Sequence, residues 1–377
     1  WLRSYSRETL RADAVAGLTV GVMLVPQAMA YAMLAGLPPV IGLYASVLPL
    51  IAYALIGTSQ QLAVGPVAIV SLLVLSAVSP LAERGSPAFV AAAALLALLV
   101  GAIQIVSGAL RLGFLANYLS HSVISGFTSA AAIIIIISQL SHLLGIDVES
   151  GHSVLDTATA ILTGIGSPHP ATLLMGACAV AFLLVMRWRF PRWPAPLLLV
   201  VATTVVVWAL RLEQLGVAVV GDVPRGLPHI ALPSAPLELL SDLGRPALTI
   251  VLVGFMESIA IARLIAAREN SRIDADRELL GLGAANALAA FVGAYPVTGG
   301  LSRTAINYQA GARTRIAGVI TAALVMLTVL LLTPLFAHLP KAALAGVVIV
   351  AVSGLVSPGE ARHLFRIKRA DGWTFVV

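Results

Sequence analysis

Residues 20–34 read VGVMLVPQAMAYAML, an apolar stretch with a proline–glutamine pair, Pro26–Gln27, near its middle. A proline inside a helix costs about 3 kcal/mol, because it removes one backbone hydrogen bond and clashes with the preceding turn. An amide side chain in an apolar segment adds a further cost, because water is not there to satisfy it. The pair therefore predicts a break in the helix of the first apolar segment. Because such a break is costly there, we expect it to serve a function.

The composition indicates a membrane protein. Of the 377 residues, 59% are hydrophobic and only 11% are charged, whereas soluble domains carry about 25% charged residues. A soluble chain of this composition would expose apolar patches far larger than soluble proteins tolerate. The net charge of +6 comes mostly from connecting segments, so we expect a lipid bilayer as partner and no nucleic acid.

Twelve apolar segments are read as membrane crossings. On this path seventeen of the 23 Lys and Arg residues lie on the side of the N-terminus, five lie on the opposite side, and Arg303 lies inside a segment. The excess of positive charge predicts a cytoplasmic N-terminus. The segments are about 14–35, 38–56, 66–79, 88–108, 113–137, 170–186, 195–210, 247–267, 279–293, 298–311, 315–335 and 342–356.

Two of these segments, 66–79 and 298–311, are too short to cross a bilayer. About 14 residues of helix reach about 21 Å, whereas the hydrocarbon core is about 30 Å thick. Each segment follows a proline, Pro66 or Pro296, and proline fits the first turn of a helix. We therefore expect two half-helices that start near mid-membrane, each preceded by extended chain at 61–64 or 291–294.

The spacing of polar residues around the half-helices repeats. Gln27 precedes Pro66 by 39 residues and Glu257 precedes Pro296 by 39, with an offset of 230 positions between the copies. Seven crossings separate the copies, so the second copy is inverted. Inverted repeats hold substrate between discontinuous helices, and two facing helix N-termini, each with about half a positive charge, favour an anion. The repeat thus explains the break expected at Gln27.

The polar residues near these breaks are the candidate site. Glu257 is the only acidic residue deep in an expected crossing, where a carboxylate is costly unless it is protonated or beside a cation; we expect it to carry a proton or to hold sodium together with Thr298. Tyr31 lies four residues after Gln27, on the same helix face. Arg303 adds positive charge or pairs with a lipid or loop carboxylate. The remaining candidates for anion binding are Val67, Ala68, Gly299, Gly300, Leu301 and Ser302.

Enzyme chemistry is not visible in the sequence. The seven histidines form no pair with metal-ligand spacing, and no phosphate-binding loop or nucleophile motif occurs. We expect no enzymatic activity, no cofactor and no metal site, apart from H⁺ or Na⁺ as a coupling ion. Cys178 is predicted to be a small buried apolar residue, and residues 357–369 to form a basic helix on the inner leaflet.

Two stretches resemble the sulfate permease family of anion transporters. They are DAVAGLTVGVMLVPQAMAYAMLAGLPPVIGLYASVLPLIAYALIGTSQQLAVGPVAIVSLLV at 13–74 and YPVTGGLSRTAINYQAGARTRIAGV at 295–319. The resemblance implies an all-α polytopic membrane protein with two inverted seven-span repeats, of which this chain lacks the last spans. It implies a core domain (about 14–110 and 246–335) that moves against a gate domain (about 111–245 and 336–377).

The resemblance also implies a position for the site and a set of partners. The anion is expected at the two half-helix ends, and the family pattern carries over to Gln27, Tyr31, Val67 and residues 301–303, with Glu257 in cation coupling. A cytoplasmic STAS domain is expected after the last span, in a protein of the bacterial cell (inner) membrane, and a homodimer is left open. Family substrates include sulfate, bicarbonate, chloride and dicarboxylates such as fumarate.

Three functions are compatible with these features. The first is a secondary active transporter of a small anion, coupled to protons or sodium and working by alternating access. The second is a nucleobase–proton symporter of the same fold; such carriers place an acidic residue in the second half-helix region, and residues 298–302 contain none. The third is an anion channel or a membrane scaffold, which differs from the first in that it cannot accumulate an anion against a gradient.

Overall fold

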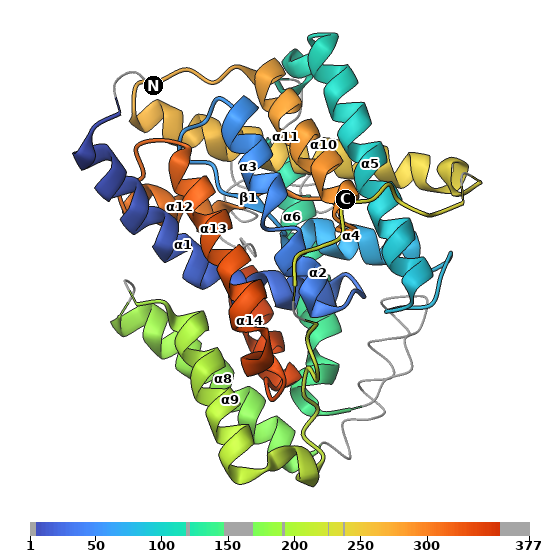
Figure 1. The fold of residues 1–377 in the computed structure, drawn as a ribbon, viewed down its shortest axis with the longest axis vertical. Coiled ribbons are helices and arrows are strands. Elements are labelled where there is room, and N and C mark those ends of the chain that lie inside the picture. Colours follow the sequence, from blue (N-terminus) through green and yellow to red (C-terminus); the bar gives the residue numbers. More distant parts are fainter. Residues whose placement is uncertain are drawn as a thin grey trace. The chain divides into compact units, whose positions relative to one another are not determined.

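The computed structural model describes residues 5–117, 121–146, 169–190, 193–224, 226–236 and 238–354. The chain divides into two compact units: residues 1–119 with 225–331 form unit 1, and residues 120–224 with 332–377 form unit 2. Figure 1 shows the helices of both units. The basic helix expected at 357–369 lies outside the described residues.

Unit 1 contains both halves of the expected repeat. Its first half comprises α1 (Arg7–Leu34), α2 (Pro39–Tyr44), α3 (Leu48–Ile56), strand β1 (Val64–Gly65), α4 (Ala68–Val78), α5 (Pro87–Ala109) and the 3₁₀ helix η2 (Leu112–Asn117). Its second half comprises α10 (Leu239–Arg268), α11 (Ala275–Phe291), strand β2 (Thr298–Gly299), α12 (Leu301–Gln309) and α13 (Ile316–Leu331).

The expected break at Pro26–Gln27 is wrong. Helix α1 runs without interruption through 28 residues with Pro26 inside it, and Glu257 likewise lies within the continuous helix α10. Proline removes only one hydrogen bond of a helix, and α1 packs against α2, α4, α12 and α13, which support the helix across that gap. Both Pro26 and Gln27 are buried in unit 1.

The two half-helices are present, and their starts are joined by a strand pair. Strands β1 and β2 pair antiparallel, with Val64 opposite Gly299 and Gly65 opposite Thr298. Helix α4 begins three residues after β1 and has 11 residues, and α12 begins two residues after β2 and has 9. Because the strands are antiparallel, the two helices leave this crossing in opposite directions, as the inverted repeat predicts.

The predicted boundaries of the half-helices need correction. Neither proline occupies the first turn: Pro66 precedes the N-cap residue of α4, and Pro296 lies five residues before α12. Phe291 ends α11 and residues 292–293 form a turn, so the chain that leads through β2 into α12 is 294–300. The reason is the strand pair, which uses the residues before each helix as a ladder.

Close helix packing in unit 1 relies on glycine. At Gly101 of α5 an added Cβ would lie 2.6 Å from the Ala287 nitrogen of α11, and at Gly42 of α2 it would lie 1.9 Å from the Ala28 carbonyl oxygen of α1. Small residues allow helix backbones to approach in membrane proteins. These contacts fix α2 and α5 against the helices that carry the candidate site.

Unit 2 comprises α6 (His121–Leu144), α8 (Pro170–Arg189), α9 (Ala195–Leu210), 3₁₀ helices η3 (Leu212–Leu215) and η4 (Thr333–Phe336), and α14 (Lys341–Ser353). Its core packs side chains of α8, α9 and α14 together, including Ala179, Leu199 and Val347. Cys178 is exposed on α8, which corrects the prediction of a buried residue. It lies beside the buried Ala179 but turns to the outer face of the helix.

Among the described residues, five helices are long and apolar enough to cross a membrane. The shorter apolar helices are α4, residues 128–144 of α6, α9, α13 and α14. Helices α11 and α12 also lie at expected crossings, but they do not belong to this apolar group. The all-α polytopic fold expected from the sequence is therefore confirmed, with the short strands as an addition.

Candidate functional site

The starts of α4 and α12 lie together at the strand crossing. Val67 is the N-cap of α4 and Gly300 that of α12, and neither helix has a side-chain cap. The Gly300 N–H donates to the Ala63 carbonyl (3.1 Å), and the Ala63 N–H donates to Thr304 Oγ1 (3.0 Å). The crossing thus joins two helix ends that each carry about half a positive charge.

Arg303, in the first turn of α12, brings a full positive charge to this crossing. Its side chain is 2% exposed, and its Nη1 donates to the Pro66 carbonyl. Its Nη2 lies 3.4 Å from the Cβ position of Gly65 and 2.9 Å from that of Gly300. Among the described residues, Nε and Nη2 of Arg303 are buried without a hydrogen-bond partner. A buried guanidinium with free N–H groups is a strong donor for an anion.

Three further side chains lie within electrostatic range of Arg303. Its charge interacts electrostatically with Glu257, Tyr31 and Tyr295. Tyr31 and Gln27 of α1 are 6% and 4% exposed. Within the described part of the chain, Glu257 Oε2 and Gln27 Oε1 are buried and find no hydrogen-bond partner. Burying such polar atoms is costly, and they are therefore candidates for contact with a ligand.

Thr298 has structural partners that explain its burial. Its hydroxyl donates to the Gly254 carbonyl (2.6 Å) and lies 2.6 Å from Ser258 Oγ, which accepts the Gly299 N–H (2.9 Å). These bonds tie β2 to α10, the helix that carries Glu257. A role of Thr298 in cation binding stays a prediction.

The other predicted residues divide into two groups. Val67, Ala68, Gly299 and Gly300 lie at the crossing. The N–H groups of Gly299 and Gly300 are already bonded to Ser258 Oγ and to the Ala63 carbonyl. Leu301 and Ser302 belong to the first turn of α12, but their side chains are exposed on unit 1. The helix turn separates them from the buried Arg303, and only their backbone lies at the crossing.

Asn286 is a residue that the sequence reasoning missed. It is fully buried in α11, and its Oδ1 accepts the Val297 N–H (2.7 Å) while its Nδ2 donates to Gln104 Oε1 (2.9 Å), the Leu282 carbonyl (3.0 Å) and the Val297 carbonyl (3.1 Å). Asn286 therefore holds the chain that leads into β2. Tyr295, missed as well, lies in the quoted YPVTGG motif and accepts a hydrogen bond from Ser71 of α4 (3.4 Å).

Two acidic residues of unit 1 are more deeply buried than Glu257, which is half-buried as a residue. Asp13 of α1 and Glu278 of α11 are both fully buried. Each lies one residue outside an expected apolar segment, so hydropathy did not place it in the interior.

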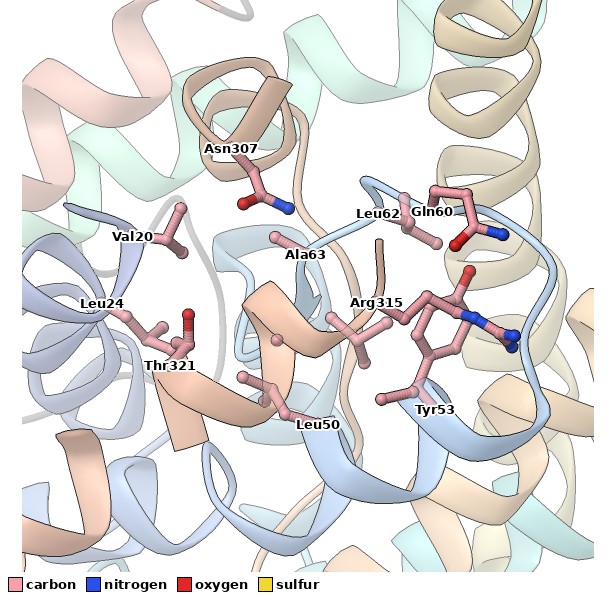
Figure 2. A pocket seen from close by; sticks show the side chains of 13 residues that line it. Val20, Leu24, Leu50, Tyr53, Gln60, Leu62, Ala63, Asn307, Arg315 and Thr321 are labelled. Carbon is pink, nitrogen blue, oxygen red and sulfur yellow. The ribbon is translucent and has the colours of Figure 1, made fainter. Parts of the chain in front are cut away.

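A small cavity lies in unit 1 beside the crossing (Figure 2). Its volume is about 10 Å³, and its polar lining includes Tyr53, Gln60, Asn307 and Arg315. That volume holds about one water molecule. None of the predicted anion or cation residues lines it, so this cavity is separate from the candidate site.

The architecture defines the class of protein: a polytopic membrane protein with an inverted repeat, in which two half-helices start at one crossing beside a buried arginine. The chain belongs to the sulfate permease family, whose profile matches residues 10–377.

Relatives across this family have similar sequences. The chain is 42% identical to "Sulfate transporter 4.1, chloroplastic" of Arabidopsis thaliana, over 98% of this chain and 55% of the relative. It is 38% identical to a probable sulfate transporter of Mycobacterium tuberculosis, over 98% of this chain and 66% of the relative. The chain thus spans about half to two thirds of the length of these relatives. They are named as transporters, in agreement with the prediction that the chain is not an enzyme.

Solved structures share the fold. The structure of SLC26A9 matches with a TM-score of 0.94 at 28% identity, covering 100% of this chain and 63% of that one. The transmembrane domain of a cyanobacterial bicarbonate transporter, BicA, matches with a TM-score of 0.87 at 24% identity, covering 99% of this chain and 94% of that one.

Proposed function

We propose that this chain is the membrane part of a secondary active transporter that carries a small anion, with sulfate as its leading substrate. The observation that carries the proposal is Arg303, whose buried guanidinium keeps Nε and Nη2 without a partner among the described residues. A buried guanidinium with unsatisfied N–H groups is costly, and an anion that accepts hydrogen bonds from them would offset that cost.

The charge of the site favours a dianion. Arg303 contributes one positive charge, and the ends of α4 and α12 contribute about half a charge each, which gives about two positive charges in all. Sulfate and dicarboxylates such as fumarate match this charge, whereas bicarbonate is a monoanion. The names of the relatives favour sulfate among the dianions.

Glu257 is proposed to couple transport to a cation. An ionised carboxylate near the site would cancel about half of its positive charge. Two unit charges about 6 Å apart repel each other by about 3 kcal/mol at an effective dielectric constant of about 20. A proton or a sodium ion on Glu257 removes this repulsion, so cation and anion bind together and are carried as symport by alternating access.

The remaining proposals concern the setting of the chain. We place it in the cell (inner) membrane with a cytoplasmic N-terminus, because of the distribution of Lys and Arg. Unit 1 would act as the core and unit 2 as part of the gate. A STAS domain and a homodimer are proposed for the full-length protein from the family resemblance.

Uptake of radiolabelled sulfate into proteoliposomes tests the proposal. We expect accumulation driven by an inward proton or sodium gradient, and competition by unlabelled sulfate that exceeds competition by bicarbonate. Competition by unlabelled fumarate would indicate that the site also takes dicarboxylates, and competition by uracil would indicate a nucleobase carrier. Uptake that only equilibrates and never exceeds the outside concentration would indicate a channel and would refute the transporter.

A further inference from the structure

Two buried carboxylates lie in unit 1 away from the anion site. Asp13 of α1 and Glu278 of α11 are both fully buried, and each accepts several hydrogen bonds from a connecting loop. Burial of a carboxylate is costly unless its oxygens are satisfied. The loops that satisfy them lead into and out of the half-helices.

Glu278 holds the loop that precedes β1 and α4. Its Oε1 accepts the Thr58 N–H (2.6 Å), the Thr58 hydroxyl (2.6 Å) and the Ser59 N–H (3.0 Å), and its Oε2 accepts the Tyr53 hydroxyl (2.7 Å). Residues 57–63 form neither helix nor strand. The Gly300 N–H holds the Ala63 carbonyl at their end, and the bonds from Thr58 and Ser59 to Glu278 hold their start.

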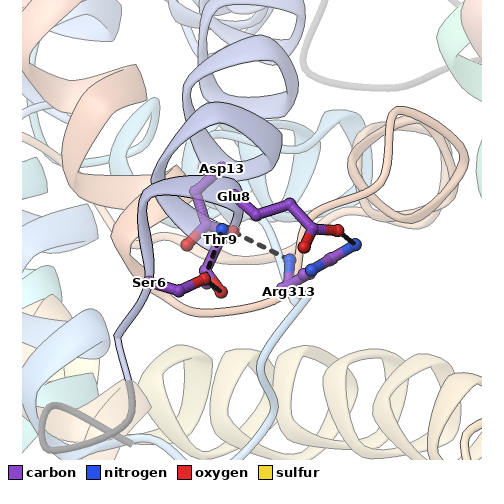
Figure 3. Close-up of polar contacts among 5 residues, drawn as sticks. All are labelled: Ser6, Glu8, Thr9, Asp13 and Arg313. Atoms are coloured by element: carbon purple, nitrogen blue, oxygen red, sulfur yellow. Dashed lines mark hydrogen bonds and ion pairs between the residues drawn. The ribbon is translucent and has the colours of Figure 1, made fainter.

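Asp13 holds the loop that follows α12. Its Oδ1 accepts the N–H groups of Arg313 (2.8 Å) and Thr314 (2.9 Å), and its Oδ2 accepts the hydroxyls of Thr314 and Tyr5 (3.0 Å for Tyr5). Figure 3 shows the bond from the Arg313 N–H to Asp13 together with the exposed ion pair between Arg313 and Glu8.

Arg315 connects the two loops. Its Nη1 donates to the carbonyl of Gly57, next to the residues held by Glu278, and its charge interacts electrostatically with Glu278 and Tyr53. The chain segments that lead into and out of the half-helices are thereby joined by hydrogen bonds in which the Arg303 side chain takes no part.

We propose that Glu278, Asp13 and Arg315 are positioning residues for the anion site, which rests on the function proposed above. They hold the loops at 57–59 and 313–315, so that β1 and β2 keep their register and both helix ends stay beside Arg303. None of the three touches the anion; each acts through the loop that it binds.

Isosteric substitutions test this role. Glu278→Gln and Asp13→Asn keep the shape of the side chain but present an NH₂ group to loop donors that need an acceptor. We expect the dissociation constant for sulfate to rise at least tenfold in each variant, measured with the purified chain well below its unfolding temperature. Glu8→Gln is the matched control. Glu8 pairs with Arg313 at the surface, its side chain is 76% exposed, and the dissociation constant for sulfate should change less than twofold in this variant.

Two measurements separate positioning from plain stability. Thermal unfolding reports whether each variant is folded, and a purely structural role would lower the unfolding temperature while sulfate affinity at low temperature stayed at the wild-type value; that result would overturn the proposal. If Glu278→Gln does not fold, Tyr53→Phe removes only one of its four donors, and a two- to fivefold rise in the dissociation constant is then expected.

A second comparison distinguishes failure of this inference from failure of the proposed function. Wild-type protein without measurable sulfate binding or uptake would refute the function itself. Wild-type binding that is lost in Arg303→Gln but retained within twofold in the folded Glu278→Gln and Asp13→Asn variants would leave the function standing and refute the positioning role.

Discussion

Replacing Arg303 with glutamine should remove anion binding without unfolding the protein. Glutamine ends two bonds short of Nη1 and so loses the bond to the Pro66 carbonyl. It also loses the charge and the N–H groups at Nε and Nη2, which have no partner among the described residues. A hydrogen bond to a charged group contributes about 1.5–3 kcal/mol. The loss of two such bonds therefore weakens binding by at least about 3 kcal/mol, or more than about a hundredfold in the dissociation constant.

The assay is thermal unfolding of the purified protein with and without sulfate. At sulfate one hundred times above the wild-type dissociation constant, binding stabilises the wild type by about 2.7 kcal/mol. The same concentration only half-saturates a variant with hundredfold weaker binding, and stabilises it by about 0.4 kcal/mol. Without sulfate the variant should unfold within about 1–2 kcal/mol of the wild type, because loss of the bond to the Pro66 carbonyl is offset by removal of a buried guanidinium with N–H groups unsatisfied by the described residues.

Arg313→Gln is the matched control for this experiment. Arg313 lies in the loop just after α12, its side chain is 50% exposed, and it pairs with Glu8 at 2.7 Å. An exposed pair contributes about 0–1 kcal/mol, so sulfate should stabilise this variant as it does the wild type. A folded Arg303→Gln protein that binds sulfate within threefold of the wild type would show that the anion binds elsewhere.

Glu257→Gln should abolish the dependence of sulfate uptake on the proton or sodium gradient while sulfate exchange across the membrane persists; uptake that is still driven by the same gradient would assign coupling to another residue. Asn286→Ala should lower the free energy of unfolding by about 2–4 kcal/mol, because it leaves the Val297 N–H and carbonyl buried without their partner, and denaturant titration checks this loss. Gly42→Ala should destabilise by about 1–3 kcal/mol, because the new Cβ would overlap the Ala28 carbonyl 1.9 Å away. Gly318→Ala is its control: no atom lies within 4 Å of the added Cβ, and the helix should gain up to about 1 kcal/mol.

The sequence alone was enough to predict the membrane class, the two short helices and their inverted relation. These features follow from local properties: hydropathy over about 20 residues sets a crossing, and a segment too short for the bilayer must begin inside it. The matched spacing of Gln27 with Pro66 and of Glu257 with Pro296 then related two distant segments without knowledge of any contact. Local properties gave a wrong prediction at Pro26. One missing hydrogen bond suggested a break, but the buried surroundings of Pro26 allow α1 to continue.

Only the tertiary structure decided which polar groups meet. The β1–β2 ladder pairs Gly65 with Thr298, and Asp13 binds the N–H of Thr314, 301 positions away in the sequence. Neither contact can be predicted from the local sequence. A two-residue strand has no periodicity, and a carboxylate at the end of an apolar segment is expected to be exposed to solvent. Arg303 and Ser302 are neighbours in the chain, yet the turn of α12 buries one and exposes the other. Which side of a short helix faces the crossing depends on the strands that precede it, and that direction is set by pairing across more than two hundred residues.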